Sequence, residues 1–402
     1  MNTSKLSKYL FYLTILILPV NLGYHFLISD AYVKGLLLDY LIPTFYLQDF
    51  LIILLLALNI KRIRVKGDSS DKFLLWFLFS VFLSTLISDY FISSFTAFLR
   101  LSLYALFMLY VKNNINFNRE YKRITIILGI SILLISILSL FQWVKQSSVF
   151  DNYLFFGEQP YSISTPGINI ENFFGESKVP PYATFRHPNI LGGILSILLV
   201  WFLLNIEKNI FLKIAFILGV VVLFFTLAKF AWISFGLGLF VLFVHKKYET
   251  NWFKITYFIV MLSLVVGFIF PKFPYINIFS YHPSFYRRAD LLIASYKLIS
   301  KKPLFGVGYN SSTAFIDVHM PSKNDIRFAQ PTHNIFILTF VESGIFAFHA
   351  FLFFIFLKLK KSKVNIALTI SLMQIVFLGS FDHYFMTIHQ TQLLMWLILG
   401  FI

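Results

Sequence analysis

The chain has 402 residues, of which 58% are hydrophobic and only 13% are charged. Soluble domains carry about a quarter charged residues, so this composition predicts a polytopic membrane protein and argues against a soluble globular domain. The net charge is +16. The chain has no cysteine, which excludes disulfides, thiolate catalysis and cysteine metal sites.

Apolar windows of about 20 residues, the length that crosses a bilayer core, recur along the chain and predict about 12 transmembrane helices. The first is interpreted as a retained span, because no small-x-small cleavage site follows it. Residues 35–43 are too short to span and are expected to form an extracytoplasmic or re-entrant approach to the second span. The expected spans are residues 9–28, 44–60, 73–91, 95–111, 124–144, 189–206, 211–228, 230–245, 254–270, 335–357, 364–380 and 386–402.

The distribution of Lys and Arg predicts the orientation of these spans. Alternate short connections carry the basic clusters, from Lys5 and Lys8 near the N-terminus to Lys358 and Lys360 near the last spans. The basic side of a membrane protein is usually cytoplasmic, so both termini are expected in the cytoplasm. The positive charge is therefore a topology signal, and no nucleic-acid partner is predicted. Residues 1–402 are expected to form a single transmembrane domain in a lipid bilayer.

Two long connections, residues 145–188 and 271–334, then fall on the extracytoplasmic side. The first is rich in proline turns. In the second, the apolar residues Ala289, Leu292, Tyr296 and Ile299 recur at helical spacing, with charged residues between them. This pattern predicts an all-α fold whose second long loop carries an amphipathic surface helix of about 15 residues.

Several polar side chains are expected to face the same outer compartment. Most Arg and Lys residues at span ends simply reach toward phospholipid headgroups, and most histidines at helix starts are caps or interface residues. Arg100 is different, because an arginine inside a span usually faces a polar cavity or a partner, for which Asp49 is one candidate. The candidate site residues are His333, Asn334, Arg186, His187, Lys229, Arg288, Arg100, Asp382 and His383.

The chemistry that suits this set is transfer from a phosphorylated lipid. Converging cations would hold a diphosphate and stabilise the charge that builds on it as it leaves. A neutral histidine could accept the proton of an attacking hydroxyl. No HExxH or DxD motif and no outer carboxylate cluster is present, so neither a metal site nor a cofactor is predicted.

Four short stretches resemble motifs of the superfamily of O-antigen ligases and Wzy-type polymerases, which are polytopic bacterial glycosyltransferases of the GT-C type. Residues 382–384 also fit the last outer turn of that family. The four stretches are residues 46–51 (YLQDFL), residues 185–192 (FRHPNILG), Arg288 followed by residues 303–310 (PLFGVGYN), and residues 332–334 (THN) with Gly344 after a ten-residue gap from His333.

The resemblance implies an active site at the periplasmic face of the bacterial inner membrane. It implies a glycan donor on undecaprenyl diphosphate, an acceptor hydroxyl on lipid A-core or on a second glycan, and an inverting, metal-independent displacement. It assigns the general base to His333 and the donor diphosphate to Arg186 and Arg288. Lys229 stands where the family usually has arginine, so it would keep the charge without the bidentate fork.

Ligase and polymerase both fit the sequence, with the spacing from His333 to Gly344 favouring the ligase. A protein-directed O-oligosaccharyltransferase is a further alternative within the superfamily. A transporter or flippase is the alternative from another class, and it would predict charged or broken helices at the bilayer midplane. Here the polar groups are expected at one face.

Overall fold

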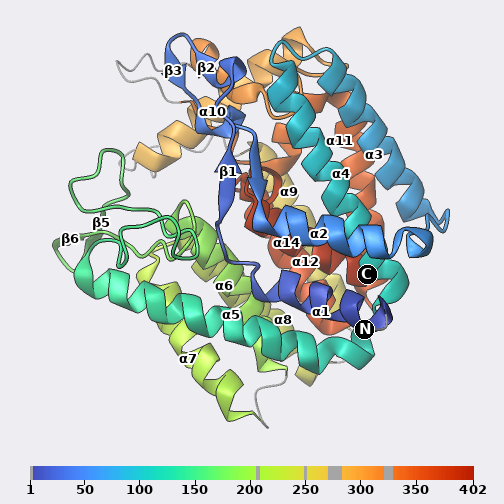
Figure 1. The fold of residues 1–402 in the computed structure, drawn as a ribbon, viewed down its shortest axis with the longest axis vertical. Helices are drawn as coiled ribbons and strands as arrows, with labels where there is room; N and C mark the ends of the chain where they lie inside the picture. Colours follow the sequence, from blue (N-terminus) through green and yellow to red (C-terminus); the bar gives the residue numbers. More distant parts are fainter. Residues whose placement is uncertain (1–2, 205–208, 249–250, 270–282, 321–328) are drawn as a thin grey trace.

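The computed structural model describes residues 3–204, 209–248, 251–269, 283–320 and 329–402, which fold mainly into helices (Figure 1). Two-stranded antiparallel sheets pair β1 (Gly23–His25) with β4 (Thr44–Tyr46), β2 (Tyr32–Val33) with β3 (Leu36–Leu37), and β5 (Glu171–Phe173) with β6 (Glu176–Lys178). The α-helices are α1 (Thr3–Leu16), α2 (Leu47–Leu58), α3 (Ser69–Leu86), α4 (Phe91–Asn114), α5 (Phe117–Lys145), α6 (Pro188–Leu203), α7 (Ile210–Phe225), α8 (Lys229–Lys247), α9 (Trp252–Ile269), α10 (Pro283–Lys301), α11 (Ile335–Ser362), α12 (Ile366–Gly379), α13 (Tyr384–Thr387) and α14 (His389–Phe401).

The all-helical membrane architecture is confirmed. Among the described residues, six helices are long and apolar enough to cross a membrane, namely α3, α4, α5, α8, α9 and α11. Helices α2, α6, α7 and α12 are apolar but shorter. The expected number of crossings and the cytoplasmic position of the termini stay predictions, as does the division of the chain into a membrane domain with two outer loops.

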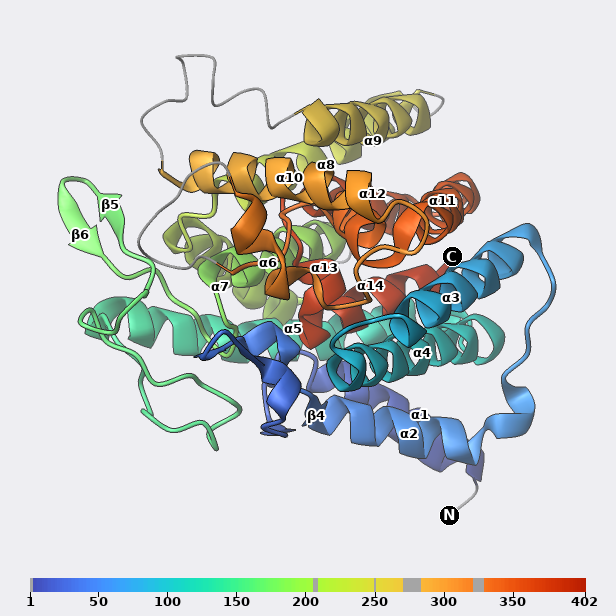
Figure 2. The same cartoon turned by 90° about the horizontal axis from the view of Figure 1, so that it is seen from above.

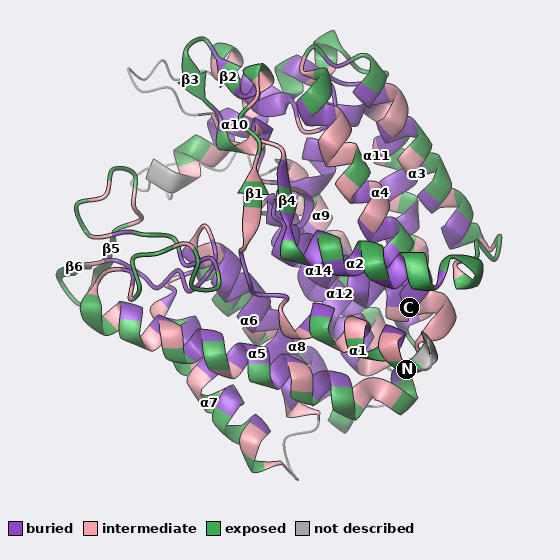
Figure 3. Ribbon diagram, viewed as in Figure 1, coloured by how far each residue is buried: buried purple, intermediate pink, exposed green. Residues whose placement is uncertain are grey.

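Helices α12 and α14 form the centre of the bundle. Almost all their side chains are buried, whereas the outer helices have exposed apolar faces (Figure 3). Helix α12 packs against α6, α8, α9 and α11, and α14 packs against α4. The side chain of Gln374 on α12 donates to the carbonyl oxygens of Ser196 on α6 at 2.8 Å and of Ser234 on α8 at 3.0 Å. These bonds satisfy a buried amide and fix the spacing of three helices.

The first span differs from its expected range. Helix α1 ends at Leu16 instead of continuing to residue 28, because Pro19 lacks a backbone N–H and restricts the residue before it. The carbonyl groups freed by this ending are bound by side chains of other elements. Gln48 donates to Ile17 at 2.8 Å and to Val20 at 2.6 Å, and Gln390 donates to Pro19 at 2.7 Å.

Residues 23–46 leave the bundle after this ending and form the paired strands β1, β4, β2 and β3. Lys34 and Gly35 have positive φ angles of 52° and 80° and make the turn between β2 and β3. Ala31 and Leu41 pack with Ala314 of the second long loop in one small apolar cluster. The segment expected as an extracytoplasmic or re-entrant approach to the second span is therefore part of a hairpin that packs against that loop.

The predicted amphipathic helix is confirmed as α10, with 19 residues (Figure 2). It packs against α11 through buried residues that include Leu292 and Leu298. Asp290, one of the charged residues between the expected apolar positions, is buried, so the buried face of the helix is rotated from its expected position. Whether α10 also touches the membrane surface stays a prediction. Residues 271–282 and 321–328 of this predicted outer loop lie outside the described residues.

The loop after α10 docks into a break in α11. Gly344 has a φ of 76° inside α11, and a Cβ there would overlap the carbonyl oxygen of Leu304. The backbone N–H of Val307 donates to Val341 at 2.9 Å, and the freed N–H of Ile345 donates to Pro303 at 2.9 Å. Two of the motifs singled out in the sequence thus contact each other and hold the first turns of α11.

Candidate functional site

A cavity of about 800 Å³ lies where residues 25–42, the loop 153–190 and the turns at residues 329–333 and 382–388 meet. Its wall includes five of the predicted site residues: Arg186, His187, His333, Asp382 and His383. These residues come from stretches far apart in the sequence, and the fold brings them to one space. Cavities of this size accommodate small-molecule ligands.

His333 enters the cavity from the residue before the N-cap of α11. Its Nδ1 lies 3.1 Å from the carbonyl oxygen of Pro331, which requires the proton on Nδ1 and leaves the lone pair on Nε2. Burial, the largest effect, lowers the pKa of the His333 imidazole well below its ordinary value. The ring is therefore neutral and has the tautomer of a general base at Nε2.

Asn334 caps the N-terminus of helix α11 and is not part of the cavity wall. Its Oδ1 accepts from the backbone N–H groups of Phe336 and Ile337, each at 3.0 Å, and its Nδ2 donates to the carbonyl of Ser380 at 3.1 Å. It is thus the N-cap of α11 and a link to the end of α12. This predicted supporting residue fixes the position of His333.

Asp382 and His383 lie beside His333 in the turn after α12. The rings of His333 and His383 meet edge to face, with centroids 4.8 Å apart. Asp382 Oδ1 accepts from the backbone N–H of His383 at 2.8 Å, and its Oδ2 lies 3.6 Å from Nη2 of Arg288. Burial acts to raise the pKa of the Asp382 carboxyl, but the interactions with His333, His383 and Arg288 outweigh burial and lower that pKa. Asp382 is therefore an anion next to the proposed base.

Arg288 is the arginine of its pair that reaches this cluster, since Arg287 is exposed. Its guanidinium contacts Asp382 and lies over the ring of Phe230, with its central carbon 5.2 Å from the ring centroid. Burial lowers the pKa of Arg288 from its ordinary value. Lys229, the residue before Phe230, is exposed and is not part of the cavity wall, so its role stays a prediction.

His333, Asp382 and His383 are also donor types that metals use, and one ligand atom of each lies within 4.8 Å of the others. Sequence reasoning missed this group, because His333 is remote from the other two in the chain. Arg288 already contacts the Asp382 carboxylate, and its positive charge opposes a cation at the same oxygens. The predicted absence of a metal stays a prediction.

His187 has the opposite tautomer to His333. Its Nδ1 accepts the backbone N–H of Asn189 at 3.1 Å, which caps α6 and leaves the proton on Nε2. Burial lowers the pKa of His187 to about 4. The cavity therefore has a neutral acceptor at His333 and a neutral donor at His187.

Arg186 is a cation that lies in the wall of the cavity. No hydrogen bond or ion pair of its side chain is found in the described part of the chain. Burial acts to lower the pKa of Arg186, but Tyr46, Tyr153, Tyr40 and Asp39 outweigh burial and raise it. The guanidinium is thus charged, surrounded by aromatic rings, and free to bind an anion.

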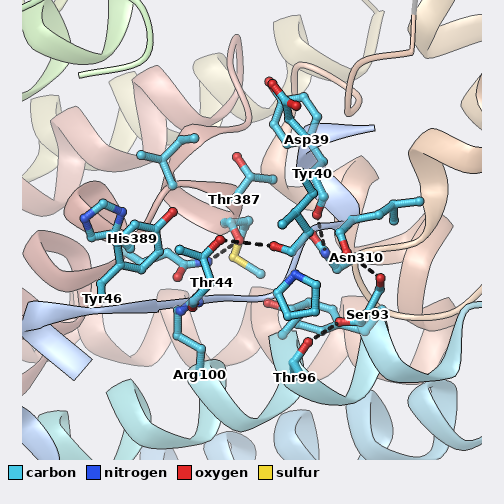
Figure 4. Close-up of a pocket in the computed structure, with 18 of the residues that line it drawn as sticks. Asp39, Tyr40, Thr44, Tyr46, Ser93, Thr96, Arg100, Asn310, Thr387 and His389 are labelled. Carbon is cyan, nitrogen blue, oxygen red and sulfur yellow. Dashed lines mark hydrogen bonds between the residues drawn. The ribbon is translucent and has the colours of Figure 1, made fainter. Parts of the chain in front are cut away.

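Arg100 lies in a smaller polar pocket that adjoins the cavity, hereafter the annex (Figure 4). Its Nε is 3.4 Å from Oδ2 of Asp49, it donates to the carbonyl of Thr44, and it lies over the ring of Tyr46 at 4.9 Å. Tyr104 donates to Asp49 at 2.9 Å. The pairing with Asp49 that the sequence suggested is present, and Arg100 also faces a polar pocket, as expected of an arginine inside a helix.

Other residues of the cavity wall lie outside the motifs that were recognised in the sequence. Asp39 and Tyr40 come from the short hairpin segment, and Tyr153, Tyr161 and Tyr182 come from the first long loop. The aromatic content of that loop was the available signal, but it is common to the whole chain, which has 21 tyrosines and 51 phenylalanines.

The comparisons with known proteins bear on the second half of the chain. Residues 214–352 match the family model Wzy_C, described as O-Antigen ligase. The match contains Lys229, Arg288 and His333, while Arg186 and Asp382 lie outside it. No curated protein matches the chain. Residues 214–352 are thus similar to the O-antigen ligase family, in agreement with the motifs that the sequence shows.

Proposed function

We propose that this protein is an inverting, metal-independent glycosyltransferase of the O-antigen ligase type. It transfers a glycan from undecaprenyl diphosphate to a hydroxyl of lipid A-core at the periplasmic face of the inner membrane. The observation that carries this proposal is the neutral His333 with its Nε2 lone pair, beside the Asp382 anion and in one cavity with the cation Arg186.

The proposed reaction is a direct displacement. The acceptor oxygen forms a bond to the anomeric carbon of the donor as the bond from that carbon to the diphosphate oxygen breaks. The electron pair of the broken bond stays on the diphosphate, and the hydroxyl proton moves to Nε2 of His333. The imidazolium keeps its Nδ1–H on Pro331, and the negative charge of Asp382 stabilises it.

Cations would stabilise the leaving diphosphate. Arg186 is the strongest candidate because its side chain is unpaired in the described residues and lies in the cavity wall. Arg288 is proposed to use the N–H groups that remain beside its contact with Asp382, since a guanidinium has five. Lys229 is proposed as a weaker contact. His187 is proposed to donate from Nε2 to a substrate oxygen.

The Wzy-type polymerase, which uses the same donor chemistry with a second glycan as acceptor, is the alternative. The description of the matched family as O-Antigen ligase and the spacing from His333 to Gly344 favour the ligase. A transporter or flippase is less well supported, because a base, an anion and an unpaired cation in one cavity suit a chemical step.

Deletion of the gene, followed by a gel of the surface polysaccharide, tests the proposal. A ligase predicts loss of the ladder from lipid A-core with accumulation of lipid-linked polymer outside the membrane. Single-repeat glycans on the core would instead identify a polymerase. Lipid-linked glycan retained on the cytoplasmic side would identify a flippase, and an unchanged ladder would contradict all three.

A further inference from the structure

The annex is a second binding space beside the cavity. Asp39, Tyr40 and Arg186 line both, so a ligand in the cavity can reach into the annex. The free volume of the annex is about 40 Å³, compared with about 800 Å³ for the cavity. A water needs about 10–15 Å³ on this measure, so the annex can take a small substituent and not a whole sugar ring.

Two arginines give the annex its positive charge. Arg100 uses N–H groups on Asp49 and on the carbonyl of Thr44, which leaves others of its five without a partner among the described residues. Its side chain is 21% exposed. Arg186 adds a second guanidinium at the border with the cavity. The acidic side chain that lines the annex is Asp39, which is exposed at its rim.

Gln392 adds a buried polar side chain to the wall of the annex. It lies on α14, is 7% exposed, and lines the annex. Its Nε2 donates to the carbonyl of Met386, but its Oε1 has no hydrogen-bond partner in the described residues. A buried acceptor without a donor is unfavourable, and a bound hydroxyl group would satisfy it.

We propose that the annex recognises an acidic sugar unit of the transferred or accepting glycan. The carboxylate or phosphate of that unit binds Arg100 and Arg186, and a hydroxyl group of the same unit donates to Oε1 of Gln392. The sugar ring remains in the cavity, where Tyr40 lines the passage. This inference rests on the proposed function and adds a substrate class to it.

The test uses the full-length protein in detergent with small probes. Glucuronate and glucose 6-phosphate carry the two kinds of anion, glucose is the neutral control, and pyrophosphate represents the donor diphosphate. Binding is followed by the thermal midpoint of unfolding at increasing probe concentration. Both acidic sugars should raise the midpoint, and glucose at the same concentration should not.

The variants locate the effect in the annex. Gln392→Met removes the unpaired acceptor and Arg186→Gln removes a cation, and each should weaken acidic-sugar binding at least tenfold. Gln392→Glu, which keeps the shape of the side chain and repels an anion, serves where the Met variant is unstable. Lys72→Gln removes an exposed cation of α3 outside both cavities and should bind like the wild type.

Two outcomes would overturn the inference: equal shifts with glucose, or unchanged binding of the acidic sugars in both Gln392 variants. Competition by pyrophosphate is expected, because Arg186 is also proposed to bind the donor diphosphate. His333→Ala should retain acidic-sugar binding while losing transfer. Binding without any transfer by the wild type would therefore reject the proposed function alone, and transfer without acidic-sugar binding would reject the annex alone.

Discussion

His333 and His187 illustrate how two histidines in one cavity are given different chemistry by single hydrogen bonds. A carbonyl at Nδ1 makes Nε2 of His333 an acceptor, and a backbone N–H at Nδ1 makes Nε2 of His187 a donor. Sequence alone favoured His333 through a motif and left His187 as a supporting candidate. The tautomers could not be predicted, because each depends on the backbone around the residue.

Replacement of His333 by alanine should abolish glycan transfer, with a loss of at least 100-fold, the lower end of what a general base contributes. Transfer is measured as the ladder on lipid A-core in a deletion strain that carries the variant. Equal membrane levels of variant and wild type provide the control. Substantial transfer by His333→Ala would rule out the base assignment.

The pH dependence of transfer follows from the lowered pKa of His333. A base acts only when unprotonated, so an ordinary histidine would lose half its activity near pH 6.5. Because burial lowers the pKa of His333 in the folded protein, the fraction of unprotonated ring stays near one as the pH falls through 6.5. Initial rates with purified protein should therefore be flat from pH 7.5 to about 6. A decline centred at pH 6.5 or above would contradict this.

Arg288 combines an ion pair with Asp382 and a stacking contact with Phe230, so its loss should affect the site rather than the fold as a whole. Arg288→Ala should reduce donor use at least tenfold. Arg288→Lys should restore only part of this loss, since lysine lacks the planar guanidinium that binds a phosphate with two hydrogen bonds. The readout is the rate against donor concentration. Arg287→Ala changes the exposed neighbour and is the matched control. Full activity of Arg288→Ala would exclude the assigned role.

At the scale of elements, apolar windows located the helices well and their ends less well. Each expected span overlaps a described helix, but α1 ends at Leu16 because Pro19 follows and side chains from α2 and α14 bind the freed carbonyls. A hydropathy window registers none of these contacts. The small hairpin of residues 23–46, which closes one side of the cavity, was therefore mistaken in part for the end of a span.

The break in α11 gives a test at this scale. Gly344→Ala places a side chain at a φ of 76° and against the carbonyl of Leu304, which should destabilise the protein by about 2–4 kcal/mol. Gly236→Ala, in α8, has open space around the new methyl group and should be neutral or slightly stabilising. Thermal unfolding in detergent compares the two. Equal midpoints would mean that the docked loop contributes little to α11.

At the scale of the whole molecule, the sequence predicted which residues face one compartment but not how they meet. Arg186, His187, His333, Asp382 and His383 do share a cavity, and Arg100 has both a partner and a polar pocket. Lys229 is exposed and lies outside the wall of that cavity. The hairpin residues Asp39 and Tyr40 and the orphaned acceptor of Gln392 were absent from the expected set. Their positions result from tertiary packing, which has no local signature.

The cluster of His333, Asp382 and His383 is where a metal ion could bind if the reaction required one. If a divalent ion were required, its ligands would be these three groups, and EDTA would stop transfer. We expect no effect of EDTA, because Arg288 holds the Asp382 carboxylate and supplies the positive charge that a metal would otherwise bring.

Purified protein is assayed for transfer with EDTA and then with added Mg²⁺, Mn²⁺ or Zn²⁺. Loss of transfer with EDTA that one of these ions restores would replace the cation-based account with metal catalysis at the same three residues. An EDTA-insensitive rate that falls in Arg288→Ala would instead show that the enzyme meets its need for positive charge with its own arginines.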